Sequence, residues 1–263
     1  VDLSKVTAKG AIVDERAETA TSDVVALLKN SSDVTVQKAT VDNTVTVTGK
    51  KLTVVGVLTT GTTLPTATAT EISAASVDAS AATSVDADAL TKLLGWAKAV
   101  TVDDVTVGSS VTVDEGKTLV VNGDITSLTN LSGKGNVTYK NVTMTADELK
   151  AAPVVTNVAV DKFEVGAKVV LTFSKPLDKT TAETTSNYTF ADGTSQPTVA
   201  SAELSEDGKT VTITTATNAI EGSATTLTVG TSVKDFADVV FTTTNAKVSF
   251  GATYDAEHTI GNA

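Results

Sequence analysis

The sequence predicts a mainly β protein in two parts: an α+β repeat domain, with helices followed by short strands, and then a β-sandwich. Three observations lead to this prediction. The chain is rich in β-branched residues, its first half contains an internal repeat, and its second half is a regular series of short alternating segments. At 263 residues, the chain is long enough for two domains.

The composition favours strands and an aliphatic core. Hydrophobic residues make up 41% of the chain but aromatic residues only 4%, so Val, Leu, Ile and Ala must fill the interior. Val and Thr are abundant, and β-branched side chains suit a pleated, half-buried surface. The composition therefore indicates a β-rich protein before any pattern is read.

The first half contains two similar segments about 66 residues apart. Residues 34–48 read VTVQKATVDNTVTVT, and residues 100–114 read VTVDDVTVGSSVTVD. The segments that follow are also similar: residues 49–59 read GKKLTVVGVLT, and residues 116–126 read GKTLVVNGDIT. Similarity at a fixed period marks repeated structural units. We expect alternating strands in both copies, a hairpin-type turn at Asn122-Gly123, and a strand or surface loop in the linker 60–85.

A short helix is expected before the strands of each copy. Apolar residues recur at helical spacing in 22–28 and again in 88–94, with Ser22 and Asp86 or Asp88 as candidate N-caps. Thr145 to Glu148 has the pattern of a capping box and predicts a third helix start. Residues 1–150 are thus predicted to form the repeat domain, with Trp96 anchored in its core.

After Pro153 the helical signal ends and short strands follow at regular spacing. Asp192-Gly193 and Asp207-Gly208 are turn signals between them. Such a series predicts an Ig-like β-sandwich over 151–252, with 253–263 as a linker or the start of another module. The predicted strands are 154–160, 168–174, 187–190, 198–204, 209–215, 225–230, 239–243 and 246–250.

Charge and cysteine content exclude several classes of function. The net charge of −11 is spread along the chain and repels nucleic acid and anionic lipid. Arg16 is the sole arginine, which weighs against enzymes that clamp phosphate or carboxylate groups. The chain has no cysteine and no apolar run of about 18 residues. Its first residues are not a signal peptide. If the protein is exported, we therefore expect this chain to be a mature fragment whose anchor lies outside it.

Four motifs in the second half resemble the Ig-like modules of bacterial S-layer (surface-layer) proteins and related surface proteins. They are VLTFSKPLD at 170–178, TSNYTF at 185–190, LSEDGKTVTI at 204–213 and GTSVKD at 230–235. Phe236-Ala237-Asp238 stands where the family often has a Gly-Asn turn, so that loop is expected to differ. The resemblance covers 151–250 and leaves the repeated half unassigned.

The resemblance implies a secreted, extracellular coat protein on the bacterial cell surface. Such a protein is structural and non-catalytic, self-assembles with its own copies, and is held on the cell wall by separate anchoring domains. Two alternatives remain open. One is a surface adhesin or ligand-binding module, which would show a concave site with grouped aromatics. The other is an accessory Ig-like region of an extracellular polysaccharide-degrading enzyme, which a flanking catalytic domain would reveal.

Candidate chemistry is sparse, and no catalytic residue is predicted. His258 is the sole histidine and lies five residues from the end of the chain, where it is a poor basis for a triad or a zinc site. The resemblance implies calcium, which takes oxygen ligands from loops. Asp178, Asp235 and Asp238 lie near the ends of predicted sandwich strands and are the candidate calcium ligands.

Overall fold

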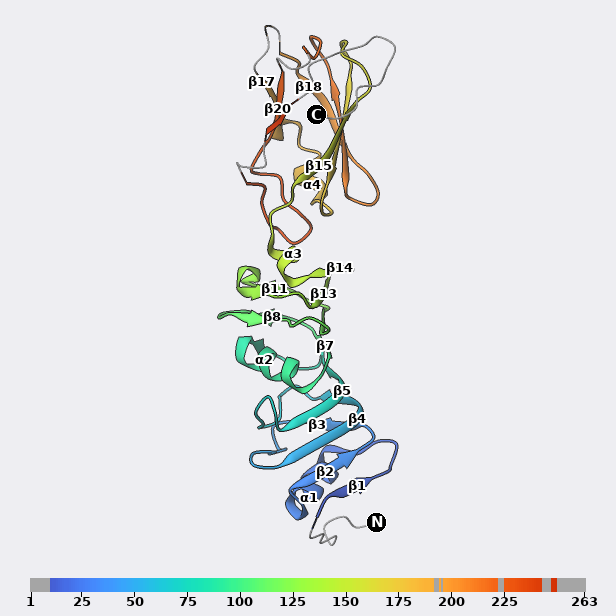
Figure 1. Cartoon of the computed structure of the whole chain (residues 1–263), viewed down its shortest axis with the longest axis vertical. Helices are drawn as coiled ribbons and strands as arrows, with labels where there is room; N and C mark the ends of the chain where they lie inside the picture. The colour runs from blue at the N-terminus through green and yellow to red at the C-terminus, as the bar shows by residue number, and fades with distance from the viewer. Residues whose placement is uncertain (1–9, 192–193, 195, 222–224, 243–246, 250–263) are drawn as a thin grey trace. The chain divides into compact units, whose positions relative to one another are not determined.

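The computed structural model describes residues 10–191, 194, 196–221, 225–242 and 247–249. The chain divides into two compact units, residues 1–150 and 151–263. Each unit has its own layers and its own core (Figure 1).

Unit 1 is built around a large parallel sheet. Nine strands belong to it, in the order β1-β2-β4-β5-β7-β10-β13-β14, with β3 paired to β4. Its strands are β1 Ile12–Asp14, β2 Asp33–Val36, β3 Ala39–Val41, β4 Lys51–Thr60, β5 Ile72–Ala79, β7 Ala99–Val102, β10 Thr118–Val121, β13 Asn136–Tyr139 and β14 Val142–Thr145. All neighbouring pairs are parallel except β13 with β14.

Smaller parallel sheets form the other walls of unit 1. One has the order β11-β8-β6 and the other joins β12 to β9. Their strands are β6 Val85–Asp86, β8 Val105–Thr106, β9 Val111–Thr112, β11 Ile125–Thr126 and β12 Leu131–Ser132. Paired positions advance by about 20 residues from one strand to the next, as from Val34 to Leu52 to Ile72. Unit 1 is therefore a β-solenoid, and the 66-residue similarity spans about three of its coils.

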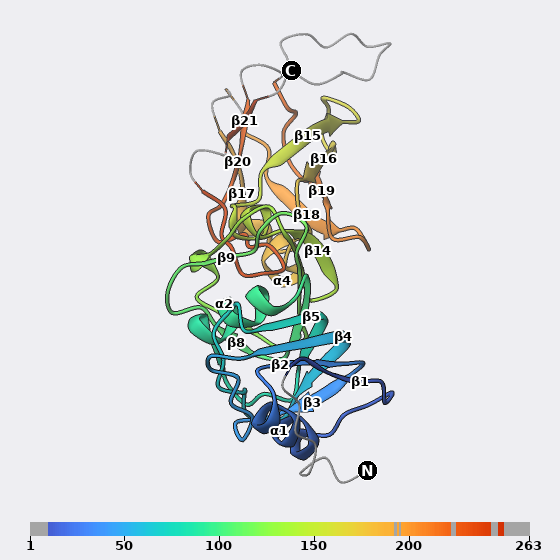
Figure 2. The ribbon, with the colours of Figure 1, turned by 60° about the horizontal axis from the view of Figure 1, so that its bottom comes forward.

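Helices fill part of the solenoid wall. They are α1 Thr21–Asn30, α2 Ala87–Trp96 and α3 Ala146–Lys150, with a 3-10 turn at Leu128–Asn130. Both views show α2 and β8 on one side of unit 1, and β4 and β5 on the other (Figures 1 and 2). Leu90, Leu93, Leu94 and Trp96 of α2 are buried, and the Trp96 Nε1 donates to the Thr68 carbonyl at 2.7 Å. The predicted core position of Trp96 is confirmed.

All three predicted helices are present, and the predicted caps are confirmed in two of them and wrong in one. The Asp86 carboxylate caps α2 by accepting from the Ala89 N–H at 2.8 Å. Thr145 and Glu148 form the capping box, with the Glu148 N–H donating to Thr145 Oγ1 at 3.2 Å. Ser22 does not cap α1, because the N-cap position is Ala20, which makes no side-chain bond there.

The hairpin predicted at Asn122-Gly123 is wrong. The strands on its two sides, β10 and β11, belong to different sheets, so the chain turns a corner of the solenoid and does not reverse. A Cβ at Gly123 would lie 2.1 Å from Asp104 Oδ1, so glycine is used here for close approach between coils. The linker 60–85 contains β5, which pairs with β4 and β7 inside the sheet.

Thr60 gives a prediction about the solenoid interior. Its side chain is 1% exposed beside Val41, and its Oγ1 has no hydrogen-bond partner among the described residues. A buried hydroxyl without a partner costs about 1–3 kcal/mol. Thr60→Val keeps the shape and removes the hydroxyl, so we expect a gain of about 1 kcal/mol in unfolding free energy. Urea unfolding followed by Trp96 fluorescence measures it. The half-buried Thr59→Val is the control, and an equal gain there would contradict the explanation.

Glu71 gives a prediction about pH. Its carboxylate accepts from the backbone N–H groups of Thr68 and Gly49, both at 2.7 Å, and these bonds lower its pKa. A lowered folded-state pKa adds stability above the unfolded-state pKa and loses it as pH falls through the folded value. Glu71→Gln should therefore lower the melting temperature at pH 7 and reduce its drop between pH 6 and about pH 3. Melting temperatures measured across this pH range test the prediction. The control Glu115→Gln, which changes an exposed carboxylate, should show neither effect.

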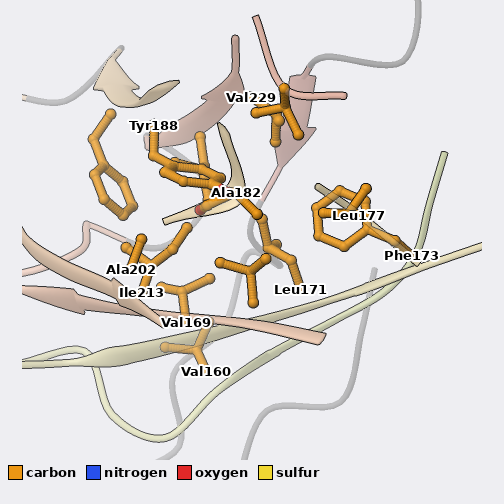
Figure 3. Close-up of a cluster of buried hydrophobic side chains, with 14 of the residues drawn as sticks. Val160, Val169, Leu171, Phe173, Leu177, Ala182, Tyr188, Ala202, Ile213 and Val229 are labelled. Atoms are coloured by element: carbon orange, nitrogen blue, oxygen red, sulfur yellow. The ribbon is translucent and has the colours of Figure 1, made fainter. Parts of the chain in front are cut away.

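Unit 2 is a two-sheet antiparallel sandwich, as predicted. One sheet has the order β15-β16-β19-β18 and the other β17-β20-β21. The strands are β15 Val155–Val160, β16 Lys168–Phe173, β17 Tyr188–Ala191, β18 Val199–Leu204, β19 Thr210–Thr215, β20 Thr226–Val229 and β21 Lys247–Ser249. Side chains from both sheets meet in the core (Figure 3). In that core Phe173 contacts Phe241 edge-to-face, with 5.7 Å between ring centroids.

Two expectations for unit 2 need correction. A one-turn helix, α4 Lys179–Ala182, and a 3-10 turn, Thr185–Asn187, interrupt the strands, although no helical signal was expected there. In the described part of the predicted strand 239–243, Val240 makes only an isolated bridge with Lys234. The Asp235 carboxylate binds the N–H groups of Ala237 and Val239, so these groups are not free to extend a ladder.

Candidate functional site

The predicted ligands Asp178, Asp235 and Asp238 lie where two loops of unit 2 run side by side. The loop after β16 carries residues 174–178, and residues 233–239 lie against it. Leu177 and Asp235 form an antiparallel bridge, the Asp178 N–H donates to Lys234 O at 2.9 Å, and the Phe236 N–H donates to Pro176 O at 3.0 Å. The backbone thus brings together the motifs at 170–178 and 230–235.

A buried ion pair lies at the centre of this arrangement. Lys175 Nζ is 2.6 Å from Asp235 Oδ2, and the side chains are 5% and 0% exposed. The other carboxylate oxygen, Oδ1, accepts from the Ala237 N–H at 2.8 Å and the Val239 N–H at 2.9 Å. Lys175 Nζ also donates to the Ala151 carbonyl. Buried charges are tolerated when they are paired and hydrogen-bonded in this way.

The other two predicted ligands have different surroundings. The Asp178 side chain caps α4, with Oδ1 accepting from the Thr181 N–H at 2.9 Å. The Asp238 side chain is 70% exposed, and its Oδ1 lies 3.7 Å from Lys234 Nζ. The three carboxylates therefore share one loop region, but each already has a partner in the protein.

A calcium ion bound by these carboxylates would have to displace the contacts that they already make. A cation bound by Asp235 would replace the Lys175 ammonium, and one bound by Asp178 would compete with the cap of α4. Within the part of the chain that the structure describes, no group of three or more His, Cys, Asp and Glu side chains is arranged to hold a metal ion. His258 lies outside the described residues. Calcium binding by Asp178, Asp235 and Asp238 stays a prediction.

Sequence reasoning missed Lys175, although a signal was present. Val169, Leu171 and Phe173 are buried at every second position of β16. Continuing that alternation places Lys175 and Leu177 on the same inward side. A lysine at an inward position requires a partner of opposite charge, so the pattern pointed to a buried acidic residue.

Unit 1 has an open groove with a volume of about 620 Å³. Its lining is dominated by hydroxyl groups, with two carboxylates and one amine. The residues are Thr48, Thr62, Thr63, Leu64, Pro65, Thr66, Ala67, Thr68, Thr83, Ser84, Asp86, Asp88, Ala89, Lys92 and Trp96. Trp96 is 2% exposed, so it offers little ring surface to a ligand. A smaller groove of about 380 Å³ lies in unit 2 beside β17 and β18.

Residues 149–252 match the model of the bacterial Ig-like domain family. The match covers all described residues of unit 2 and all four motifs quoted above. Unit 2 is therefore a bacterial Ig-like domain, and the prediction of an Ig-like module in this half of the chain is confirmed.

Three similar solved structures are of the S-layer protein SbsC. The crystal structure of rSbsC(31-844) is 25% identical, with a TM-score of 0.34, covering 41% of this chain and 15% of that one. The N-terminal part of SbsC is 26% identical, with a TM-score of 0.33, covering 40% and 25%. Domains 1-6 of SbsC are 25% identical, with a TM-score of 0.33, covering 41% and 15%. The chain thus spans a quarter or less of these proteins.

No curated protein matches the chain. None of the helices in the described ranges is both long enough and apolar enough to cross a membrane.

Proposed function

We propose that the chain is a non-catalytic structural segment of a bacterial cell-surface protein of the S-layer type. Its copies would join through protein–protein contacts into an extracellular lattice. The match of residues 149–252 to the bacterial Ig-like domain, in the stretch whose motifs resemble S-layer modules, carries this proposal. The acidic, cysteine-free composition is consistent with it.

The proposed partners are other copies of the chain and, through an anchor outside this segment, the cell wall. Nucleic acid and membrane lipid are not expected partners of a chain with a net charge of −11. Calcium, held by Asp178, Asp235 and Asp238, is the proposed cofactor of assembly.

Light scattering and negative-stain electron microscopy of the chain and of the full-length gene product test assembly. We expect ordered sheets from the full-length product. A product that stays monomeric at all concentrations, with and without millimolar Ca²⁺, would exclude the lattice. For the calcium part, Asp178→Asn is compared with Asp207→Asn, a turn carboxylate elsewhere in unit 2. If Ca²⁺ changes neither the melting temperature nor the assembly, the calcium part of the proposal is excluded and the lattice part is unaffected.

The groove of unit 1 lacks the grouped aromatics expected of an adhesin, but its size and polar lining support glycan binding as a second candidate function. Its volume is in the range of ligand sites, and its Thr and Ser hydroxyls and the Asp88 carboxylate suit a hydroxyl-rich ligand. A glycan array would be probed with the wild type, with Asp88→Asn and with Asp103→Asn as control, since Asp103 does not line the groove. Binding lost only in Asp88→Asn would support an adhesin, and no binding by the wild type would rule it out.

A further inference from the structure

Asn122 and Gly123 lie at a corner of the solenoid where the fold requires the glycine but not the asparagine. A Cβ at Gly123 would lie 2.1 Å from Asp104 Oδ1, so a larger residue is excluded there. The internal repeat places Val55 and Gly56 at the equivalent positions. A Cβ on Gly56 would lie 3.0 Å from a carbonyl oxygen of the preceding coil. The glycine therefore recurs for a structural reason, whereas the residue before it can be valine.

The asparagine that precedes this obligatory glycine carries a reactive amide. Asn122 is exposed, so its side chain can reach the backbone nitrogen that follows it. Glycine has no side chain to shield that nitrogen, which makes an Asn-Gly pair especially prone to cyclise. We propose that Asn122 is a deamidation site of the folded chain, and that it reacts ahead of the other asparagines in the described ranges.

A hydrogen bond between coils controls access to the attacking nitrogen. The Gly123 N–H donates to the Asp103 carbonyl at 3.2 Å, whereas the equivalent bond from Gly56 to Gln37 is 2.8 Å. The longer bond is the weaker of the two. Because the N–H of Gly123 is directed at the preceding coil, its nitrogen attacks only after this bond opens. The rate in the folded chain is therefore set by local opening of this corner.

The reaction needs only water as a co-reactant. The Gly123 backbone nitrogen bonds to Cγ of Asn122, and the bond from Cγ to the amide nitrogen breaks. The amide nitrogen leaves as ammonia and takes the proton of the Gly123 N–H with it, which leaves a cyclic succinimide. Water then opens the succinimide at either of its two carbonyl carbons and gives aspartate or isoaspartate at position 122.

Both products disturb the contacts between coils. Each adds a negative charge at a corner that already carries the exposed residues Asp103, Asp104 and Asp124. Like charges at short range repel one another. Isoaspartate also adds a methylene group to the backbone between β10 and β11, where the spacing of the coils is fixed by Gly123. The deamidated chain should therefore melt at a lower temperature than the unmodified chain.

Peptide mapping of the folded chain during incubation in mildly alkaline buffer tests the proposal. We expect the peptide that contains Asn122 to gain about 1 Da, with aspartate and isoaspartate forms that separate by chromatography. Peptides that contain the exposed Asn136 and Asn141, each followed by valine, should keep their amides over the same period. In guanidinium chloride the reaction at Asn122 should be about tenfold faster or more, because the bond that limits it is absent.

Three variants test the site and its control. Asp104→Ala removes the acceptor of the Asp124 N–H, a second bond between the coils at 2.7 Å, and should speed deamidation of Asn122 severalfold. Asp103→Ala changes the neighbouring exposed side chain but keeps the backbone carbonyl, so the rate should not change. Asn122→Val introduces the residue of the other repeat, and should keep the wild-type melting temperature without any mass gain in this peptide.

The wild-type measurement decides the question even if a variant folds poorly. The proposal is overturned if Asn122 keeps its amide in the folded chain, or if another asparagine of the described ranges reacts first. Equal rates in the folded chain and in guanidinium chloride would overturn the control by local opening, as would an unchanged rate in Asp104→Ala.

Discussion

Asp235→Ala should lower the unfolding free energy of unit 2 by about 3–5 kcal/mol. The substitution leaves the Lys175 ammonium buried without its partner and removes the acceptor of two backbone N–H groups. Each loss is severe because water cannot reach these groups to replace the missing contacts. Calorimetry of the whole chain measures the change, together with hydrogen exchange of the strands in unit 2.

A matched variant and a double variant test the cause. Asp238→Asn alters a 70% exposed carboxylate in the same loop and keeps a residue that tolerates the positive φ of 63°. It should cost less than about 0.5 kcal/mol. Lys175→Met/Asp235→Ala should be clearly less destabilised than the sum of its two single variants. Additive losses would show that the two side chains are not coupled.

Gly133→Ala should destabilise unit 1 by about 2–5 kcal/mol. Gly133 has a φ of +114°, and a Cβ there would lie 2.2 Å from the Val113 carbonyl oxygen in the preceding coil. The backbone of one coil must therefore move away from the other, which breaks the close approach that the solenoid requires. Urea unfolding followed by circular dichroism and by Trp96 fluorescence measures the loss.

Gly116→Ala is the control for backbone conformation alone. Gly116 has a φ of +83°, but nothing lies within 4 Å of the position that a Cβ would occupy. Gly116→Ala should therefore lower the unfolding free energy of unit 1 only through conformational strain, by about 1–2 kcal/mol. If the two alanine variants are equally stable, contact between coils is not the reason for glycine at position 133.

The sequence predicted local structure in unit 1 better than it predicted topology. Val100 and Val102 alternate inward as expected, and the caps at Asp86 and Thr145 are local contacts that a pattern can reveal. Parallel pairing is different, because Val100 meets Val77 on one side and Leu119 on the other through long connections. The same Val and Thr alternation suits antiparallel strands, so an Asn-Gly pair between two such segments predicts a hairpin that the parallel topology does not contain.

In unit 2 the motifs were sufficient to predict the sandwich but not the buried pair. The sequence marks Asp235 as an acidic residue in a loop, which does not predict that its side chain is buried. Its partner Lys175 is 60 residues earlier in the chain, and only the fold brings the two together. The inward alternation of β16 predicts that Lys175 needs a partner but does not identify which of the acidic residues provides it.

The stacking of unit 1 has a consequence for how its length can evolve. In the described part of unit 1, the strands of each coil pair with strands of the coil before it and the coil after it, so strand pairing does not fix the total number of coils. Duplication or deletion of one coil would change the unit by one strand spacing, about 4.8 Å, and leave the remaining interfaces intact. The length of such a unit can therefore change during evolution in steps of one coil, and each step keeps the packing of the remaining core.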